Sequence, residues 1–258
     1  THQELRRRAI WANWRGIADL RPDSGTGNAL PTIPGREFSA FATLPNRQQP
    51  HRVLLQLPDS FSTQSPCVVV AAASGSRGVY GAIAVASPWA LAKGCAVAFT
   101  DKGAGTDYVD LASQRGVQLN GQLGNTALAF TPPLSSLNVD NGMAFKHAHS
   151  QDNPEADWGA HVHQAAQFAL HVLNQQFTEH TFTAENTRVI ATGISNGGGA
   201  VLRAAEVQDT LIDAVVAGEP NIYIDAPGSR ALYDYGTQAA LLMPCALLTM
   251  GDFPAPPM

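Results

Sequence analysis

Short apolar runs that alternate with helical patterns constrain the fold of this chain more than any other feature of its sequence. The runs at 67–73, 95–99 and 212–217 are almost continuously apolar, as expected for strands covered on both faces of a sheet. Segment 158–177 instead repeats its apolar residues at intervals of three and four, which predicts a helix of about five turns. Because parallel strands need long, usually helical connections, the alternation predicts an α/β fold with a mainly parallel sheet and helices on both faces.

The segments outside this alternation are less regular. Two β-like runs at 37–44 and 52–57 flank a turn-rich stretch and predict an antiparallel hairpin. Apolar residues at helical spacing within residues 2–20 predict an amphipathic helix, which we interpret as part of a helical flank at 1–35 rather than as a site. Segment 103–152 is rich in Gly, Asn, Ser and Pro with little period, so we expect a long irregular excursion there.

Charge and hydropathy exclude several classes of protein. The 258 residues include 16 Lys and Arg against 21 Asp and Glu, a net charge of −5, whereas nucleic-acid binding needs a clustered surplus of cations. With 45% hydrophobic and 14% charged residues, the chain should be globular. The longest nearly uninterrupted apolar run, 239–248, contains Pro244 and is shorter than the roughly 18 residues of a membrane-spanning helix. We therefore expect neither nucleic acid nor a membrane span.

Each of the three cysteines, Cys67, Cys95 and Cys245, lies inside an apolar run. A cysteine in such a run is interpreted first as a small buried hydrophobe and only second as a disulfide partner. The cysteines therefore leave the redox compartment open.

The residues most indicative of chemistry form a Gly-Ile-Ser-Asn-Gly sequence at 193–197, between a predicted strand at 188–192 and a predicted helix at 200–207. In this context the pattern predicts the nucleophile elbow of α/β-hydrolases, a turn that holds Ser195 above the sheet. A glycine-rich turn can also bind phosphate. However, the Lys and Ser/Thr that end a P-loop are missing after Gly199, which makes that alternative weaker.

The predicted turn has physical requirements. Residues two before and two after the serine crowd each other, so only glycines, Gly193 and Gly197, fit there. The following helix start supplies a backbone N–H, so Asn196 is the first predicted oxyanion donor. The second donor in this fold comes from the loop after an earlier strand, and here Ser76 and Arg77 are the candidates. An ordinary loop after a strand is the alternative.

A base that would activate Ser195 does not follow it in the sequence. In this fold the triad partners follow in the order Ser, then Asp or Glu, then His. All eight histidines precede Ser195, so either an earlier histidine serves through an unusual topology or a longer protein supplies the acid and the base. We favour the second, because the ending at 253–258 comes before the sheet has enough strands. The expected domain is a single α/β-hydrolase catalytic domain over 1–258, incomplete at its C-terminal end.

Several downstream carboxylates are candidates for the triad acid. Glu219 and Asp252 each follow an apolar run, although residues in such places are more often caps or surface groups. Asp213, Asp225 and Asp234 are weaker candidates.

Two His-x-His pairs suggest a metal site as a competing interpretation. The pair His147/His149 shares a face only if its segment is extended, and the pair His161/His163 lies on a predicted helix, where i and i+2 point apart. We therefore predict no metal and expect His161 and His171 to be half-exposed helix positions.

Four segments together give the chain a family resemblance. It resembles the bacterial D-(−)-3-hydroxybutyrate oligomer hydrolases, and the likeness runs from about residue 3 to beyond 240. The segments that carry it are Ala73-Ser74-Gly75-Ser76-Arg77-Gly78, Phe99-Thr100-Asp101-Lys102-Gly103-Ala104-Gly105, Gly193-Ile194-Ser195-Asn196-Gly197-Gly198-Gly199 and Gly218-Glu219-Pro220-Asn221.

The resemblance implies a serine carboxylic ester hydrolase that cleaves short 3-hydroxybutyrate oligomers during polyhydroxybutyrate degradation, with Ser195 as nucleophile and no cofactor. It also implies export to the periplasm or medium, although this chain shows no signal peptide. Arg77 is a hypothetical partner for the terminal carboxylate of an oligomer, since guanidinium binds carboxylate through two parallel hydrogen bonds. The alternatives are another α/β-hydrolase, such as a tannase-like or feruloyl-type esterase, and a non-catalytic hydrolase-like binding domain. The oligomeric state is not predicted.

Overall fold

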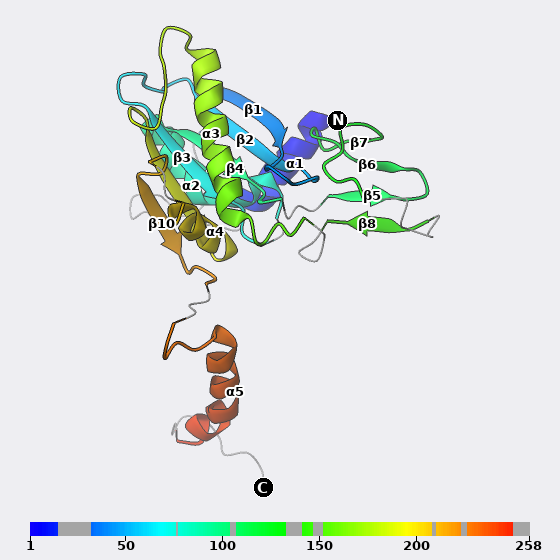
Figure 1. Cartoon of the computed structure of the whole chain (residues 1–258), viewed down its shortest axis with the longest axis vertical. Coiled ribbons are helices and arrows are strands. Elements are labelled where there is room, and N and C mark those ends of the chain that lie inside the picture. Colours follow the sequence, from blue (N-terminus) through cyan, green and yellow to red (C-terminus); the bar gives the residue numbers. More distant parts are fainter. Residues whose placement is uncertain are drawn as a thin grey trace. The chain divides into compact units, whose positions relative to one another are not determined.

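The structure is a computed structural model of the chain (Figure 1). It describes residues 1–14, 32–75, 77–103, 107–132, 141–146, 152–207, 210–222 and 226–249. The chain divides into two compact units, Thr1–Asn221 and Ile222–Met258, and each is described by itself.

The first unit is built around a six-stranded sheet in the order β1-β2-β4-β3-β9-β10 (Figure 1). Strands β4, β3, β9 and β10 are parallel, whereas β2 is antiparallel to both β1 and β4. The predicted hairpin and the mainly parallel sheet are therefore confirmed. The strands are β1 Gly35–Ala42, β2 His51–Pro58, β3 Cys67–Ala72, β4 Ala96–Thr100, β9 Arg188–Ile194 and β10 Ala214–Gly218.

Helices cover both faces of this sheet, as the alternation predicts. Alternate side chains of β3 enter two separate cores: Val68 and Val70 pack with α3 and α4, and Val69 and Ala71 pack with α2. Ile10 of α1 packs against the second core, so the N-terminal helix is docked on the sheet unit. The helical elements are α1 His2–Trp14, η1 Val79–Ala82, α2 Ile83–Ala90, η2 Leu91–Lys93, α3 Trp158–Gln176 and α4 Asn196–Ala205.

The excursion expected to be irregular contains a second sheet. Its four antiparallel strands have the order β7-β6-β5-β8 and are β5 Tyr108–Asp110, β6 Arg115–Val117, β7 Leu123–Gly124 and β8 Met143–Phe145. Strands of two or three residues are too short to produce a recognisable period, which is why the sequence does not reveal them. The expectation of an irregular segment is wrong for this part.

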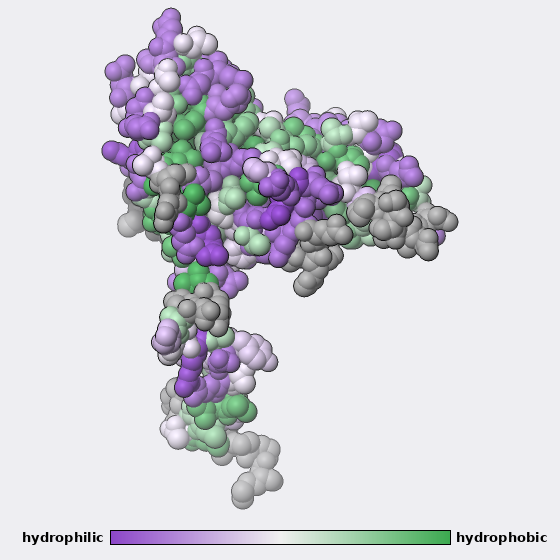
Figure 2. Space-filling model, in the orientation of Figure 1, coloured by the Kyte–Doolittle hydropathy of each residue, from purple (hydrophilic) through white to green (hydrophobic). Residues whose placement is uncertain are grey.

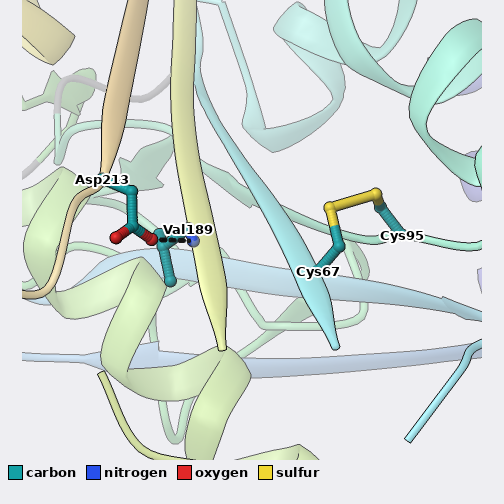
Figure 3. The surroundings of a disulfide bond; sticks show 4 residues. All are labelled: Cys67, Cys95, Val189 and Asp213. Atoms are coloured by element: carbon teal, nitrogen blue, oxygen red, sulfur yellow. Dashed lines mark hydrogen bonds between the residues drawn. A yellow bond between two sulfur atoms is a disulfide. The ribbon is translucent and has the colours of Figure 1, made fainter. Parts of the chain in front are cut away.

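Two of the cysteines form a disulfide, so the second interpretation, a disulfide partner, is confirmed for them, and Cys95 is also buried. Cys67 begins β3, Cys95 directly precedes β4, and their Cα atoms lie 4.7 Å apart (Figure 3). Because β3 and β4 are adjacent parallel strands, the two residues that start them are neighbours at the same end of the sheet. Cys245 is free and exposed rather than buried.

The second unit contains helix α5, Leu232–Leu248, which includes Pro244. The apolar run at 239–248 therefore forms part of a helix and not a strand. Among the residues with a described placement, no helix is both long and apolar enough to cross a membrane. Hydrophilic and hydrophobic residues are interspersed over the visible face of the first unit (Figure 2).

Candidate active site

Ser195 occupies a strained turn between β9 and α4. Strand β9 ends at Ile194 and α4 begins at Asn196, so one residue makes the whole turn. Ser195 has φ 57° and ψ −122°, a left-handed φ that is uncommon outside glycine. Its side chain is exposed. A strained, exposed serine between a strand and a helix start is the geometry of a nucleophile elbow.

The glycines on either side of the serine are required by backbone contacts. A Cβ on Gly193 would lie 2.2 Å from the carbonyl oxygen of Gly197, and a Cβ on Gly197 would lie 2.4 Å from the carbonyl oxygen of Ala72. Neither backbone atom can move without displacing the turn. Glycine at both positions therefore lets β9, α4 and the end of β3 meet around Ser195.

Helix α4 begins at Asn196, four residues before the predicted start at 200. The glycine-dense segment expected to be a turn is therefore mostly helical, because close contacts with the end of β3, the loop after β10 and Trp158 select glycine there rather than a need for flexibility. The first backbone N–H groups of a helix have no carbonyl partner within it. Asn196 is the first residue of α4, and its N–H stands at the positive end of the helix, directly after Ser195.

The loop after β10 holds the elbow from the other side. Ser195 N–H donates to the carbonyl oxygen of Gly218 at 2.9 Å, and the Ser195 carbonyl accepts from Asn221 N–H at 3.0 Å. Glu219 lies between these two contacts, is exposed and has φ 42°. The structure thus brings the backbone at Glu219 to the elbow.

Other acid candidates lie elsewhere. Asp213 accepts a hydrogen bond from Val189 N–H at 2.7 Å at the amino end of the sheet (Figure 3). Ser195 lies six residue steps along the strand from Val189, about 20 Å at 3.3 Å per residue, so Asp213 cannot serve as the triad acid. Asp225 and Asp252 lie outside the described residues, and Asp234 lies in α5 of the second unit.

The elbow stands where ligands bind in open α/β sheets. Strands β3 and β9 are neighbours, and the helices that follow them, α2 and α4, pack on opposite faces. Such a reversal opens a crevice at the carboxyl ends of the two strands. A cavity of about 250 Å³ lies there, lined by Ala12, Asn13, Ala72, Ser74, Arg77, Gly81, Ala82, Ala84, Val85 and Ile194.

The predicted second oxyanion loop borders this cavity. Ser74 and Arg77 line it, and the side chain of Arg77 is exposed. Ser76, the other predicted donor, lies outside the described residues. The cavity also contacts Ile194, the neighbour of Ser195, so the loop and the last residue of β9 both border it.

Helix α1 forms a wall of the cavity, which the sequence interpretation as a mere flank missed. Arg6 donates two hydrogen bonds to the carboxylate of Glu37 on β1, at 2.6 and 2.7 Å. Tyr80, two residues after the loop that ends at Gly78, donates to the same carboxylate at 2.5 Å, and Gln56 donates at 3.1 Å. Burial raises the pKa of Glu37, but these hydrogen bonds outweigh it and leave the pKa below its usual range. One carboxylate thus joins α1 to the loop region.

Lys102 is a second strained residue at the same edge of the sheet. It follows β4, has φ 60° and is fully buried. Its ammonium donates a hydrogen bond to Oδ1 of Asn196 and lies 5.0 Å from the ring centroid of Trp158. Sequence reasoning missed Lys102, although charged residues directly after an apolar strand were a visible signal.

Two buried histidines pack beside this turn. The rings of His51 and His161 lie 4.5 Å apart, with Lys146 nearby. Burial, with the charge of Lys146, lowers the pKa of each histidine to about 3. The expectation that His161 is half-exposed is wrong, because His51 of β2 and Gly103 in the turn after β4 lie against its ring, whereas His171 is exposed.

Metal ligation finds little support in this cluster. Among the described residues, no group of three or more His, Cys, Asp or Glu side chains is placed to hold a metal ion. His147 and His149 lie outside the described residues.

The strained serine between a strand and a helix, set on a mixed sheet with helices on both faces, defines an α/β-hydrolase fold. The chain belongs to the 3HB-oligomer hydrolase family, whose model matches residues 1–256.

Curated relatives agree with this assignment. The chain is 41% identical over 305 residues to a D-(−)-3-hydroxybutyrate oligomer hydrolase of Paraburkholderia xenovorans, covering 99% of this chain and 43% of the relative. It is 38% identical over 298 residues to the protein of the same name from Paracidovorax citrulli, covering 96% and 42%. The chain therefore spans about two-fifths of the length of these relatives.

Solved structures give weaker similarity. The crystal structure of vibralactone cyclase matches with a TM-score of 0.44 and 12% identity, covering 84% of this chain and 51% of that one. The esterase Est22 matches with a TM-score of 0.44 and 14% identity, covering 88% and 53%.

Proposed function

We propose that this chain carries the nucleophilic serine of a carboxylic ester hydrolase that cleaves short 3-hydroxybutyrate oligomers. The observation that carries the proposal is Ser195, exposed and strained at φ 57° between two glycines that have no room for a side chain. Membership of the 3HB-oligomer hydrolase family supports the substrate class. Since the chain spans about two-fifths of its relatives, the activity is proposed for the full-length polypeptide.

The proposed reaction is an acyl transfer in two steps. Ser195 Oγ attacks the ester carbonyl, its proton passes to a base, and the carbonyl electron pair moves onto the oxygen. The oxyanion accepts hydrogen bonds from Asn196 N–H and from an N–H of the Ser76–Arg77 loop. Collapse of the intermediate breaks the ester C–O bond, and the base returns the proton to the leaving hydroxyl. Water then repeats the sequence and releases the acid.

The base must have a pKa near the working pH to exchange this proton efficiently. Burial holds the pKa of His51 and His161 at about 3, which makes both poorly suited. Because the triad histidine of this fold follows the serine, we propose that the base lies in the remainder of the full-length protein.

Hydrolysis of defined substrates tests the proposal. Full-length protein should hydrolyse 3-hydroxybutyrate dimer and trimer faster than simple phenolic esters, and a fluorophosphonate should label Ser195. Ser195→Ala should reduce kcat by at least about 10³-fold and abolish labelling, with the fold retained because the side chain is exposed. Faster hydrolysis of the phenolic esters would favour a tannase-like or feruloyl-type esterase, and an unlabelled wild type would favour a binding domain.

Arg77 is proposed to bind the terminal carboxylate of the oligomer from the wall of the 250 Å³ cavity. Arg77→Ala should raise KM for the dimer about tenfold and leave KM for an uncharged ester unchanged. An unchanged KM for the dimer would contradict this role.

We further propose that the protein works outside the cytoplasm, in the periplasm or the medium. The Cys67–Cys95 disulfide supports this proposal, because disulfides persist in oxidising compartments. Cell fractionation with thiol-alkylation mass spectrometry tests it: oxidised protein outside the cytoplasm is expected, and reduced protein confined to the cytoplasm would contradict it.

A further inference from the structure

Lys102 combines two unfavourable features at one position. It lies two residues after the end of β4 and has φ 60°, in a region that non-glycine residues rarely adopt. Its side chain is fully buried. Burying an ammonium is unfavourable unless partners compensate for the lost water. A residue held in this way is a candidate for a role in function rather than in folding alone.

The partners of Lys102 belong to the elbow. Its Nζ donates to Oδ1 of Asn196, the residue that follows Ser195 and begins α4. The same Nζ lies 5.0 Å from the centroid of the Trp158 ring, within the range of a cation–π interaction. Trp158 begins α3, so one ammonium joins the end of β4 to the starts of two helices.

A network of hydrogen bonds holds the Lys102 backbone in place. Lys102 N–H donates to Oγ1 of Thr100 at 3.1 Å, and Oδ1 of Asp101 accepts from Gly103 N–H and from Arg52 N–H, each at 3.0 Å. Asp101 is itself buried. These hydrogen bonds fix the backbone from which the Lys102 side chain extends. A preorganised charge needs such a fixed backbone.

We propose that Lys102 is the positioning residue for the oxyanion site at Ser195, fixing Asn196 through its side chain and placing a positive charge at the residue that follows the serine. This inference rests on the proposed function. The Asn196 side-chain contact restrains the first turn of α4, whose N–H must already point at the oxyanion when it forms. The positive charge acts in a low-dielectric environment, where it stabilises negative charge more strongly than it would in water.

The charge of Lys102 gives the inference a pH signature. Burial lowers its pKa to about 8, against the opposing charges of Glu155 and Asp101. Asn196 and Trp158, which face it from α4 and α3, carry no charge. If Lys102 acts as a cation, the rate falls as pH rises through about 8. If it were instead the general base, the neutral amine would be the active form and the rate would rise over the same range.

The test is the rate at which a fluorophosphonate labels Ser195 in full-length protein, measured from pH 6 to pH 10. Lys102→Met should lower the rate 10- to 100-fold and remove the fall above pH 8, whereas Lys102→Arg should retain part of the rate and move that fall to higher pH. In steady-state hydrolysis of the dimer, Lys102→Met should lower kcat and leave KM within twofold.

A matched control is Lys146→Met. Lys146 is also a buried lysine at this end of the unit, but it donates to the carbonyl oxygen of Pro50 at 2.9 Å. Its loss should change the labelling rate less than twofold, even if the unfolding temperature falls.

The outcomes separate the inference from the function. A wild type that is not labelled would refute the proposed function. A labelled wild type with an equally labelled Lys102→Met variant and an unchanged pH profile would refute the role of Lys102 alone. A rate that rises through pH 8 in wild type and is lost in Lys102→Met would also refute it, in favour of a lysine base.

Discussion

The two ends of the parallel strands differ in how they are built. At the amino end, a disulfide joins the starts of β3 and β4, and Asp213 accepts a hydrogen bond from the N–H of Val189, the second residue of β9 (Figure 3). At the carboxyl end, the residues that follow β4, β9 and β10 all have left-handed φ, namely Lys102, Ser195 and Glu219. The amino end therefore links strands of regular backbone, whereas the carboxyl end contains residues with strained backbone.

This difference shows how one sheet serves two purposes. Strain persists only where the surrounding structure over-determines it, and such residues cluster at functional sites. The covalent link and the capped strand start secure the sheet about 20 Å away from Ser195. Changes at the carboxyl end should therefore alter chemistry, and changes at the amino end should alter stability.

The largest effect is expected from Gly193→Ala, because its Cβ would lie 2.2 Å from the Gly197 carbonyl oxygen. We expect labelling of Ser195 to fall at least about 100-fold and the free energy of unfolding to fall by about 1–3 kcal/mol. The matched control is Gly236→Ala, in α5, where a Cβ meets nothing within 4 Å. Wild-type labelling of Gly193→Ala would show that the elbow tolerates displacement.

Removal of the disulfide should have the next largest effect, and only on stability. Cys67 and Cys95 are 28 residues apart, and closing a loop of that size stabilises a fold by about 3.6 kcal/mol in the chain-entropy model. The double variant Cys67→Ala/Cys95→Ala should unfold at lower urea concentration, yet label at the wild-type rate below its transition. Cys245→Ala, which removes a free exposed thiol, is the control. A slower labelling rate in the folded double variant would mean that the two ends are coupled.

Asp213→Ala should have the smallest effect. The substitution removes the acceptor of the Val189 N–H and should lower the free energy of unfolding by about 1 kcal/mol. Asp213→Asn retains an acceptor oxygen and should lose less. Both should label at the wild-type rate, and a loss of labelling in folded Asp213→Ala would mean that the amino end of the sheet is coupled to the elbow.

The large sheet is predictable from sequence because its strands are buried on both faces. Runs such as the one that begins at Cys67 are apolar without interruption, and the helix at Trp158 has five turns over which its period can accumulate. The small sheet is not predictable, since β7 has two residues and no period. The disulfide is also hidden, because two cysteines far apart in sequence become neighbours only when β3 pairs with β4.

The site is predictable only where its chemistry is local. The Ser195 turn has its requirements within five residues, so its location follows from sequence, while its catalytic role is still a prediction. Lys102 and Glu37 contact residues up to 94 and 43 positions away, so their charges are visible in the sequence but their partners are not. His161 was misplaced for the same reason, since its burial depends on elements that are distant in the chain.

The ties made by Glu37 matter for anyone who wishes to shorten this protein. Deleting the first fourteen residues to obtain a minimal fragment would remove Ala12 and Asn13 from the cavity wall and leave the Glu37 carboxylate without its guanidinium partner. Tyr80, beside the Ser74–Gly78 loop, would then donate its hydrogen bond to a carboxylate that has lost its salt bridge. A truncated fragment would thus be altered at this cavity, even though the cut is made about 180 positions before the serine.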